Sequence, residues 1–127
     1  MSFPTLSGIG DSVGLRGNSG QVQTVTLNAS AAGSNVIVTG VPAALGVPAR
    51  IIRVLAYVLV AAGPVAVTWE SSGGLVLGGP MAFPGPVSMP VPFNPLGQFS
   101  TLPGESLVLF LDSACQVGGH VTFVIAQ

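Results

Sequence analysis

The sequence predicts an all-β fold: an antiparallel β-sandwich or jelly roll with an extended N-terminal arm. Apolar residues alternate with period two over several short segments. Turn-forming residues separate these segments about every 8 to 12 residues, as in sandwiches and barrels. No segment keeps the 3.6-residue period of an amphipathic helix. We therefore expect an arm over residues 1–20 and a single sandwich domain over residues 21–127.

The first twenty residues differ from the rest of the chain. They contain Gly8, Gly10, Gly14, Gly17 and Gly20, and their scattered apolar residues hold neither period for long. One interpretation is an arm that becomes ordered on a partner surface. A frayed terminus is the alternative that the sequence leaves open.

The longest predicted strand is Arg50–Ala61. Its β-branched residues are dense and Gly63-Pro64 follows closely, so a helix is disfavoured. Strict alternation places Ile52 and Val54 on one face and Arg53, Leu55 and Tyr57 on the other. Both faces are apolar, which indicates a central strand, or one that lies between the core and a neighbouring subunit. The other predicted strands are 22–27, 35–39, 65–70, 75–77, 107–112 and 117–126, with a brief pairing within 96–101.

The segment 78–95 is rich in proline. Because proline has no N–H to donate to a strand ladder, we expect edge strand and ordered loop here rather than a central strand. The prolines are Pro80, Pro84, Pro86, Pro90, Pro92 and Pro95.

The charge content is unusually low. Charged residues make up 6% of the 127 residues, against about 25% in an average soluble domain. With only three arginines and no lysine, the chain is not a nucleic-acid binder that works through a basic patch. The lone Cys115 excludes a disulfide scaffold, and 49% hydrophobic residues argue against disorder.

So few charges have a consequence for the surface. A compact monomer of this mass exposes about 6,200 Å², which leaves one charge per roughly 900 Å². Such a surface favours association with copies of itself or with a larger partner. The alternative is a free monomer with a neutral surface of Ser, Thr, Asn, Gln and Gly.

Membrane insertion and secretion are not predicted. The most apolar run, Val54–Val67, is about 14 residues long, and a spanning helix needs about 20. The N-terminus shows no basic segment followed by a long apolar one, so we read no signal peptide. We expect synthesis and use on the cytoplasmic side.

Two arrangements of reactive residues are candidates for a catalytic or a metal site. Gly10–Gly14 matches the G-x-S-x-G nucleophile pattern, and Asp112 and His120 follow in the hydrolase order. That pattern requires a strand, a turn and a helix in a large α/β domain, so chance explains it better. With one Cys and one His in the chain, a metal would need ligands from symmetric copies; a His bonded to backbone at a strand edge is the alternative. We predict no enzyme, metal or cofactor.

The segment from Arg50 to Gln127 resembles a group of small bacteriophage virion proteins. The similarity is a pattern of strands and turns, and it leaves residues 1–49 uncovered. The motifs that carry it are Arg-Ile-Ile-Arg-Val-Leu-Ala-Tyr from Arg50, Val-Ala-Val-Thr-Trp-Glu-Ser from Val65, Gly79-Pro80-Met81, Pro92–Phe99, Pro103–Leu107 and Val117–Val121.

The resemblance implies a jelly-roll-like sandwich that trimerises and decorates or cements a capsid. The expected partners are the major capsid protein and two further copies of the chain, with neither nucleic acid nor membrane. The expected location is the capsid surface of the virion, after synthesis in the host cytoplasm. The residues that we expect at partner interfaces are Phe3, Leu6, Ile9, Leu15 and Arg16 in the arm, and Arg50, Arg53 and Tyr57 in the sandwich.

A trimeric tail-fibre or receptor-binding tip is the second hypothesis. It shares trimeric β architecture, but it needs exposed aromatic or polar loops for contact with glycans. The 78–95 segment offers only Phe83 and Phe93 for that purpose.

Overall fold

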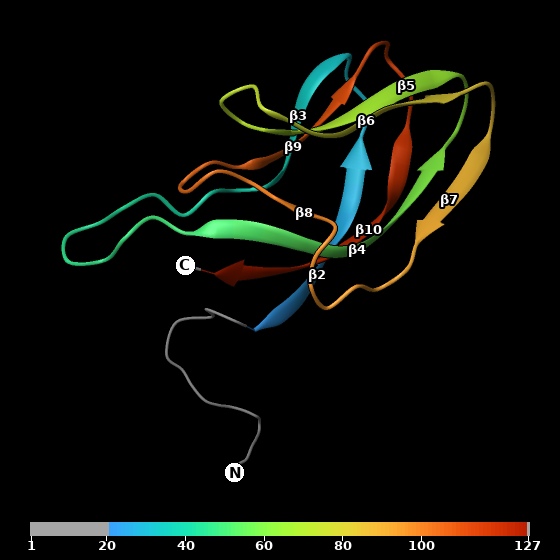
Figure 1. Cartoon of the computed structure of the whole chain (residues 1–127). Helices are drawn as coiled ribbons and strands as arrows, with labels where there is room; N and C mark the ends of the chain where they lie inside the picture. Colours follow the sequence, from blue (N-terminus) through green and yellow to red (C-terminus); the bar gives the residue numbers. More distant parts are fainter. Residues whose placement is uncertain (1–20, 127) are drawn as a thin grey trace.

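The computed structural model describes residues 21–126, and they form two antiparallel sheets packed face to face (Figure 1). The predicted all-β sandwich is confirmed, and no helix occurs among these residues. The strands are β2 (Val22–Ala29), β3 (Gly33–Val38), β4 (Ile51–Ala61), β5 (Val65–Ser71), β6 (Val76–Phe83), β7 (Val87–Val91), β8 (Phe99–Ser100), β9 (Leu107–Leu111) and β10 (Val117–Ala126).

The chain passes back and forth between the two sheets. One sheet has the order β2-β10-β4-β7, with the short β8 also paired to β4, and the other has the order β3-β9-β5-β6. The turn between β4 and β5 and the turn between β9 and β10 both join one sheet to the other, as in Greek-key and jelly-roll sandwiches. The two edge strands β6 and β7 do not pair with each other, although they are consecutive in the chain.

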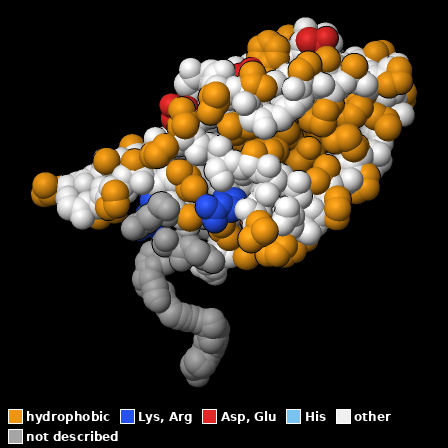
Figure 2. Space-filling view, in the orientation of Figure 1, with side chains coloured by type: hydrophobic (Ala, Val, Ile, Leu, Met, Phe, Trp, Pro, Cys, Tyr) orange, Lys and Arg blue, Asp and Glu red, His pale blue; other side chains and the backbone are white. Residues whose placement is uncertain are grey.

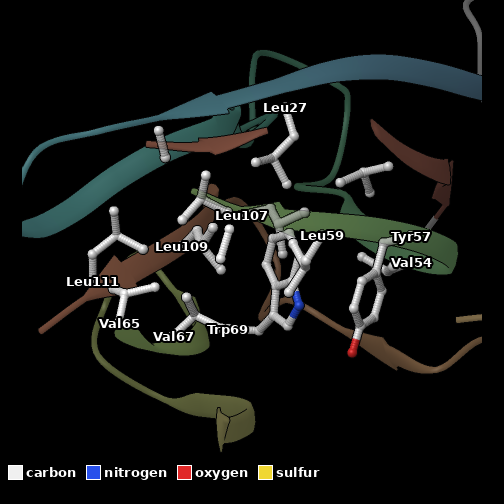
Figure 3. Packing of buried hydrophobic residues seen from close by; sticks show 14 of the residues in the cluster. Leu27, Val54, Tyr57, Leu59, Val65, Val67, Trp69, Leu107, Leu109 and Leu111 are labelled. Carbon is white, nitrogen blue, oxygen red and sulfur yellow. The ribbon is translucent and has the colours of Figure 1, made fainter. Parts of the chain in front are cut away.

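The core lies between the sheets and follows the period of two. In β5 every second side chain points inward, including Val65, Val67 and Trp69. Figure 3 shows Trp69 beside Leu59 and Tyr57 from the opposite sheet, and Val65 and Val67 farther along the same core. Burying such side chains is the main favourable term in folding.

A β-bulge interrupts the alternation that the sequence predicts for β4. The register of β4 against β10 shifts between Thr122 and Phe123, so Leu55 is the additional residue. Ile52 and Val54 therefore share the inward face with Tyr57, whereas strict alternation puts Tyr57 on the opposite face from them. That prediction was wrong because an apolar strand gives no sign of where a bulge falls.

Gly119 in β10 is required by a close approach of two strands. Its φ is +125°, and a Cβ there would overlap the carbonyl oxygen of Val58 in β4. Only glycine combines this backbone conformation with that separation. The neighbouring Gly118 has no such constraint, since the nearest atom to a Cβ there would be the Leu27 oxygen at 3.8 Å.

The proline-rich segment forms strands at the edges of both sheets. Pro80 lies in β6, which ends the four-stranded sheet, and Pro90 lies in β7, which ends the other. The predicted combination of edge strand and ordered loop is confirmed. None of the described elements is a helix that could cross a membrane.

Candidate interaction surfaces

The outer face of the five-stranded sheet is almost uncharged. Its central row runs from Thr26 through His120 and Val58 to Pro90, one residue from each strand. His120 is exposed in the middle of this row. Thr24 and the other residues of this face are small or polar, and the face contains no acid among the described residues. Arg53 is its one charged residue among those described, and its other members include Thr24, Thr26, Asn28, Ala56, Val58, Val60, Ser88, Pro90, Gly118, His120 and Thr122.

The outer face of the four-stranded sheet is more apolar. Val36, Val108, Glu70 and Val76 are paired in one row across its four strands. Val36 and Val76 are exposed, as is Phe110 two positions along β9 from Val108. A single acid therefore lies in a row with two exposed valines, Val36 and Val76, and the buried Val108, a composition that suits contact with another apolar surface.

The connection between β3 and β4 forms a projecting finger, residues 39–50 (Figure 1, teal to green). Its tip is a tight hairpin in which Ala44 and Val47 exchange two backbone hydrogen bonds of 2.9 and 2.8 Å. Gly46 in this turn has φ +75°, and Leu45 is completely exposed. The finger therefore presents an apolar side chain on a backbone that its own hydrogen bonds fix.

The base of the finger is also tied to the sandwich. Arg50 donates its backbone N–H to Val41 and accepts one from Gly104. Gly40 donates to the hydroxyl of Ser106 at 2.8 Å. The Nε of Arg50 is buried and has no hydrogen-bond partner among the described residues.

The 92–98 loop covers the outside of the β4 bulge. Asn94 and the side chain of Gln98 both donate to the carbonyl of Leu55, and the backbone of Gln98 donates to Val54. These bonds hold Phe93 and Leu96 in exposed positions at the surface. This loop is thus a second fixed apolar projection.

A further surface is the β6–β7 side, where the two edge strands are not paired with each other. Leu77, Met81, Met89, Val91 and Phe99 line it, and all are partly buried against the core. Figure 2 shows apolar side chains gathered over much of the visible surface, with few charged groups among them.

Beneath this side lie Trp69 and Tyr57. Tyr57 contacts both Trp69 and Phe99, with ring centroids 5.3 and 6.2 Å apart. The Nε1 of Trp69 is buried and has no acceptor among the described residues. Burial raises the pKa of the Tyr57 hydroxyl, and the neighbouring Trp69 side chain opposes this in part without meeting the geometry of a hydrogen bond.

Five of the residues expected at partner interfaces belong to the N-terminal arm. Phe3, Leu6, Ile9, Leu15 and Arg16 lie outside the described residues.

Three expected interface residues belong to the sandwich. Arg50 lies at the base of the finger, before β4 begins. Arg53 lies on the outer side of β4, where its aliphatic stem packs over Gly97 of the 92–98 loop. Tyr57 is only 8% exposed and belongs to the core.

Sequence reasoning did not single out Leu45, Leu96 or Phe110. For Leu45 a signal exists, because an apolar residue before glycine in a loop bracketed by Pro42 and Pro48 has no strand face to bury it. For Phe110, the alternation of β9 already indicates an outward position. What makes these residues notable is their exposure, which only the fold reveals.

Asp112, the acid in the candidate hydrolase order, has a structural role. Asp112 accepts a hydrogen bond from the backbone N–H of Ala66 at 2.9 Å, next to the turn after β9. Ser12 of the G-x-S-x-G pattern lies outside the described residues. Within residues 21–126, no three His, Cys, Asp or Glu side chains cluster in a way that could hold a metal ion.

Glu105, in the turn before β9, is hydrogen-bonded to the turn after β5 at the finger end of the sandwich. Its Oε1 accepts from the hydroxyl of the fully buried Ser71 at 2.5 Å and from the N–H of Gly73 at 2.8 Å. The bond from Ser71, and then the bond from Gly73, lowers the pKa of the Glu105 carboxyl.

Comparisons with protein-family models, with curated proteins and with solved structures found no match for this chain.

Proposed function

We propose that this protein is a structural virion protein that binds the outside of an assembled phage capsid as a trimer and cements neighbouring shell subunits. The observation that carries the proposal is the number of exposed apolar side chains held on fixed backbone, of which Leu45 at the finger tip is the clearest. Together with the sparse charge, they favour a surface that is covered in use. The sequence resemblance of residues 50–127 supplies the kind of partner.

The proposed mechanism is physical. A protein that binds only the assembled shell stabilises the shell by mass action. A trimer that engages several shell subunits at once adds avidity, because the second and third contacts form intramolecularly. Neutral and apolar patches such as the outer faces of both sheets suit close packing better than electrostatic steering.

The first test measures the mass of the purified full chain and its co-sedimentation with purified capsids. We expect a mass of three chains and saturable pelleting with capsids. A monomer that stays in the supernatant would contradict the proposal. Binding to host cells instead of capsids would favour the tail-fibre or receptor-binding tip.

The second test uses variants. Leu45→Asp places a charge at the tip of the finger, where it touches no core residue, and is expected to weaken capsid binding without changing the unfolding midpoint. Leu75→Asp is the matched control, because Leu75 is also exposed but lies in the turn before β6. Deletion of residues 2–20 tests the arm in the same assay, with circular dichroism as the check on folding. Unchanged capsid binding both by Leu45→Asp and by the deletion variant would count against these contacts.

A further inference from the structure

Trp69 and Tyr57 leave two polar groups poorly satisfied beneath the β6–β7 side. Trp69 is fully buried, and its indole N–H has no acceptor among the described residues. The hydroxyl of Tyr57 has Met81 Sδ as its partner, at 3.9 Å. Sulfur is a weak acceptor, and a buried donor without a partner is costly. Such a donor points to a ligand or segment that supplies an acceptor when bound.

The edge of the indole that carries the N–H lies near the edge strand β6 and on the side of the ring toward Tyr57 (Figure 3). Trp69 is opposite Gly78 in the β5–β6 register, and a Cβ built on Gly78 would lie 4.0 Å from the indole Cδ1. Because Cδ1 is bonded to Nε1, this edge of the ring is turned toward β6. The rings around it come from both sheets, as Figure 3 shows for Trp69 and Tyr57.

The side chains around this edge are apolar and only partly covered. Phe99 of β8 contacts the Trp69 ring, and Leu77 and Met81 of β6 and Met89 and Val91 of β7 pack, partly buried, against the same core. Methionine side chains adapt their shape to an incoming apolar group. With Pro80 and Pro90 in the two edge strands, an occupant would pack mainly through side chains rather than through a continuous strand ladder.

The chain itself contains a segment with the matching chemistry. Residues 1–10 carry no charged side chain, and they place Phe3, Leu6 and Ile9 among residues with hydroxyl and carbonyl acceptors. An extended segment of 20 residues reaches up to about 66 Å, and three strand spacings amount to about 14 Å. The length of the arm is therefore ample to reach the β6–β7 side of an adjacent molecule.

The position where the arm joins the sandwich favours an adjacent molecule. The described chain begins at Gln21, directly before β2, and β2 is the edge strand opposite β7 in the five-stranded sheet. In a closed ring of copies, each molecule presents one edge to the opposite edge of the next. The arm of one copy would then start beside the open side of its neighbour.

We propose that residues 1–10 of a second copy of this chain pack on the β6–β7 side and supply a hydrogen-bond acceptor to the indole N–H of Trp69. This inference rests on the trimer of the proposed function, and it specifies how the copies are linked.

Trp69 is the only tryptophan of the chain, so one indole N–H signal in the ¹⁵N NMR spectrum of the full chain reports on the site. Phe3→Asp combined with Leu6→Asp is expected to move that signal upfield and to speed its exchange with water. The matched control, Asn18→Asp with Ser19→Asp, adds the same charge to the arm beside the sandwich and should leave the signal in place. An indole signal that is identical in all three proteins would overturn the proposal.

A spin label then distinguishes a neighbouring copy from the same chain. A nitroxide is attached at Ser7→Cys in a Cys115→Ser background without ¹⁵N, and this protein is refolded together with an excess of ¹⁵N-labelled, spin-free full chain. Broadening of the Trp69 indole signal supports contact between copies. No broadening in the mixture, with broadening when label and ¹⁵N share one chain, would show that the arm binds its own sandwich and would overturn the proposal.

Capsid co-sedimentation of the same proteins separates this inference from the proposed function. Broadening without capsid binding would reject the capsid role and leave the link between copies intact. Capsid binding by a trimer whose Trp69 signal does not change in the arm variants would reject the link between copies and leave the capsid role intact.

Discussion

The ring of Trp69 from β5 meets the ring of Tyr57 from β4 across the two sheets, with centroids 5.3 Å apart and planes inclined by 63°. This edge-to-face contact joins the sheets close to the side where β6 and β7 are unpaired. The ring of Phe99 completes the group, and its plane is inclined by 42° to the plane of Trp69. The contact explains how side chains alone cover the core at the side where β6 and β7 are not paired.

Trp69→Ala should cost about 3–5 kcal/mol of unfolding free energy, because a fully buried indole leaves a cavity between the sheets. Urea unfolding followed by circular dichroism measures this. Phe110→Ala removes an aromatic ring from the outer face of the four-stranded sheet and is expected to cost about 1 kcal/mol. Equal losses in the two variants would contradict the placement of Trp69 in the core.

Gly119→Ala should destabilise the protein well beyond the typical ~1 kcal/mol of a point mutation. The added methyl overlaps the carbonyl oxygen of Val58, and the φ of +125° is strained for alanine. Gly118→Ala is the adjacent control, since a methyl there meets only open space and ordinary contact. Thermal unfolding of both variants checks the difference, and similar midpoints would refute it.

The acid side of the stability profile should depend on Glu105. The pKa of this carboxyl is lower in the folded protein than its ordinary value of 4.5, so the unfolded chain binds the proton more readily. The contribution is fully present above pH 4.5 and is lost as the pH falls through the folded-state pKa. Glu105→Gln is expected to flatten this part of the profile, measured by unfolding midpoints against pH. An unaltered acid slope in the variant would exclude this role.

The alkaline side should depend on Tyr57. Burial raises the pKa of its hydroxyl above 10.0, so above that pH the unfolded chain loses the proton first. The contribution is present below pH 10.0 and is lost as the pH rises through the folded-state pKa. Because Tyr57 is the only tyrosine, its phenolate absorbance gives the titration directly. Ionisation of the folded protein at the ordinary value would show that the hydroxyl is hydrated.

Local pattern was sufficient to predict the sandwich and its edge strands. The alternation of Val65, Val67 and Trp69 fixes which side chains of β5 are buried, and the prolines of 78–95 exclude a central position. The same reasoning fails at Leu55, because a bulge in a strand that is apolar on both faces leaves no mark in the residue types.

The surfaces were harder to predict than the strands. Leu45 and Leu96 differ from other leucines in their exposure. That exposure depends on distant backbone partners, Gly104 for the base of the finger and Leu55 for the 92–98 loop. The unpaired N–H of Trp69 also depends on tertiary packing, since sequence spacing says nothing about the acceptors around a ring.

Pro80 and Pro90 have a consequence for the behaviour of the protein in concentrated solution. An exposed strand edge is a template on which further chains can polymerise into fibrils. A proline in each of these two edges interrupts the row of amide hydrogens that such growth requires. A chain with so little charge lacks the electrostatic repulsion that keeps most proteins apart. At these two edges, the prolines therefore limit aggregation by strand addition because they lack an amide hydrogen.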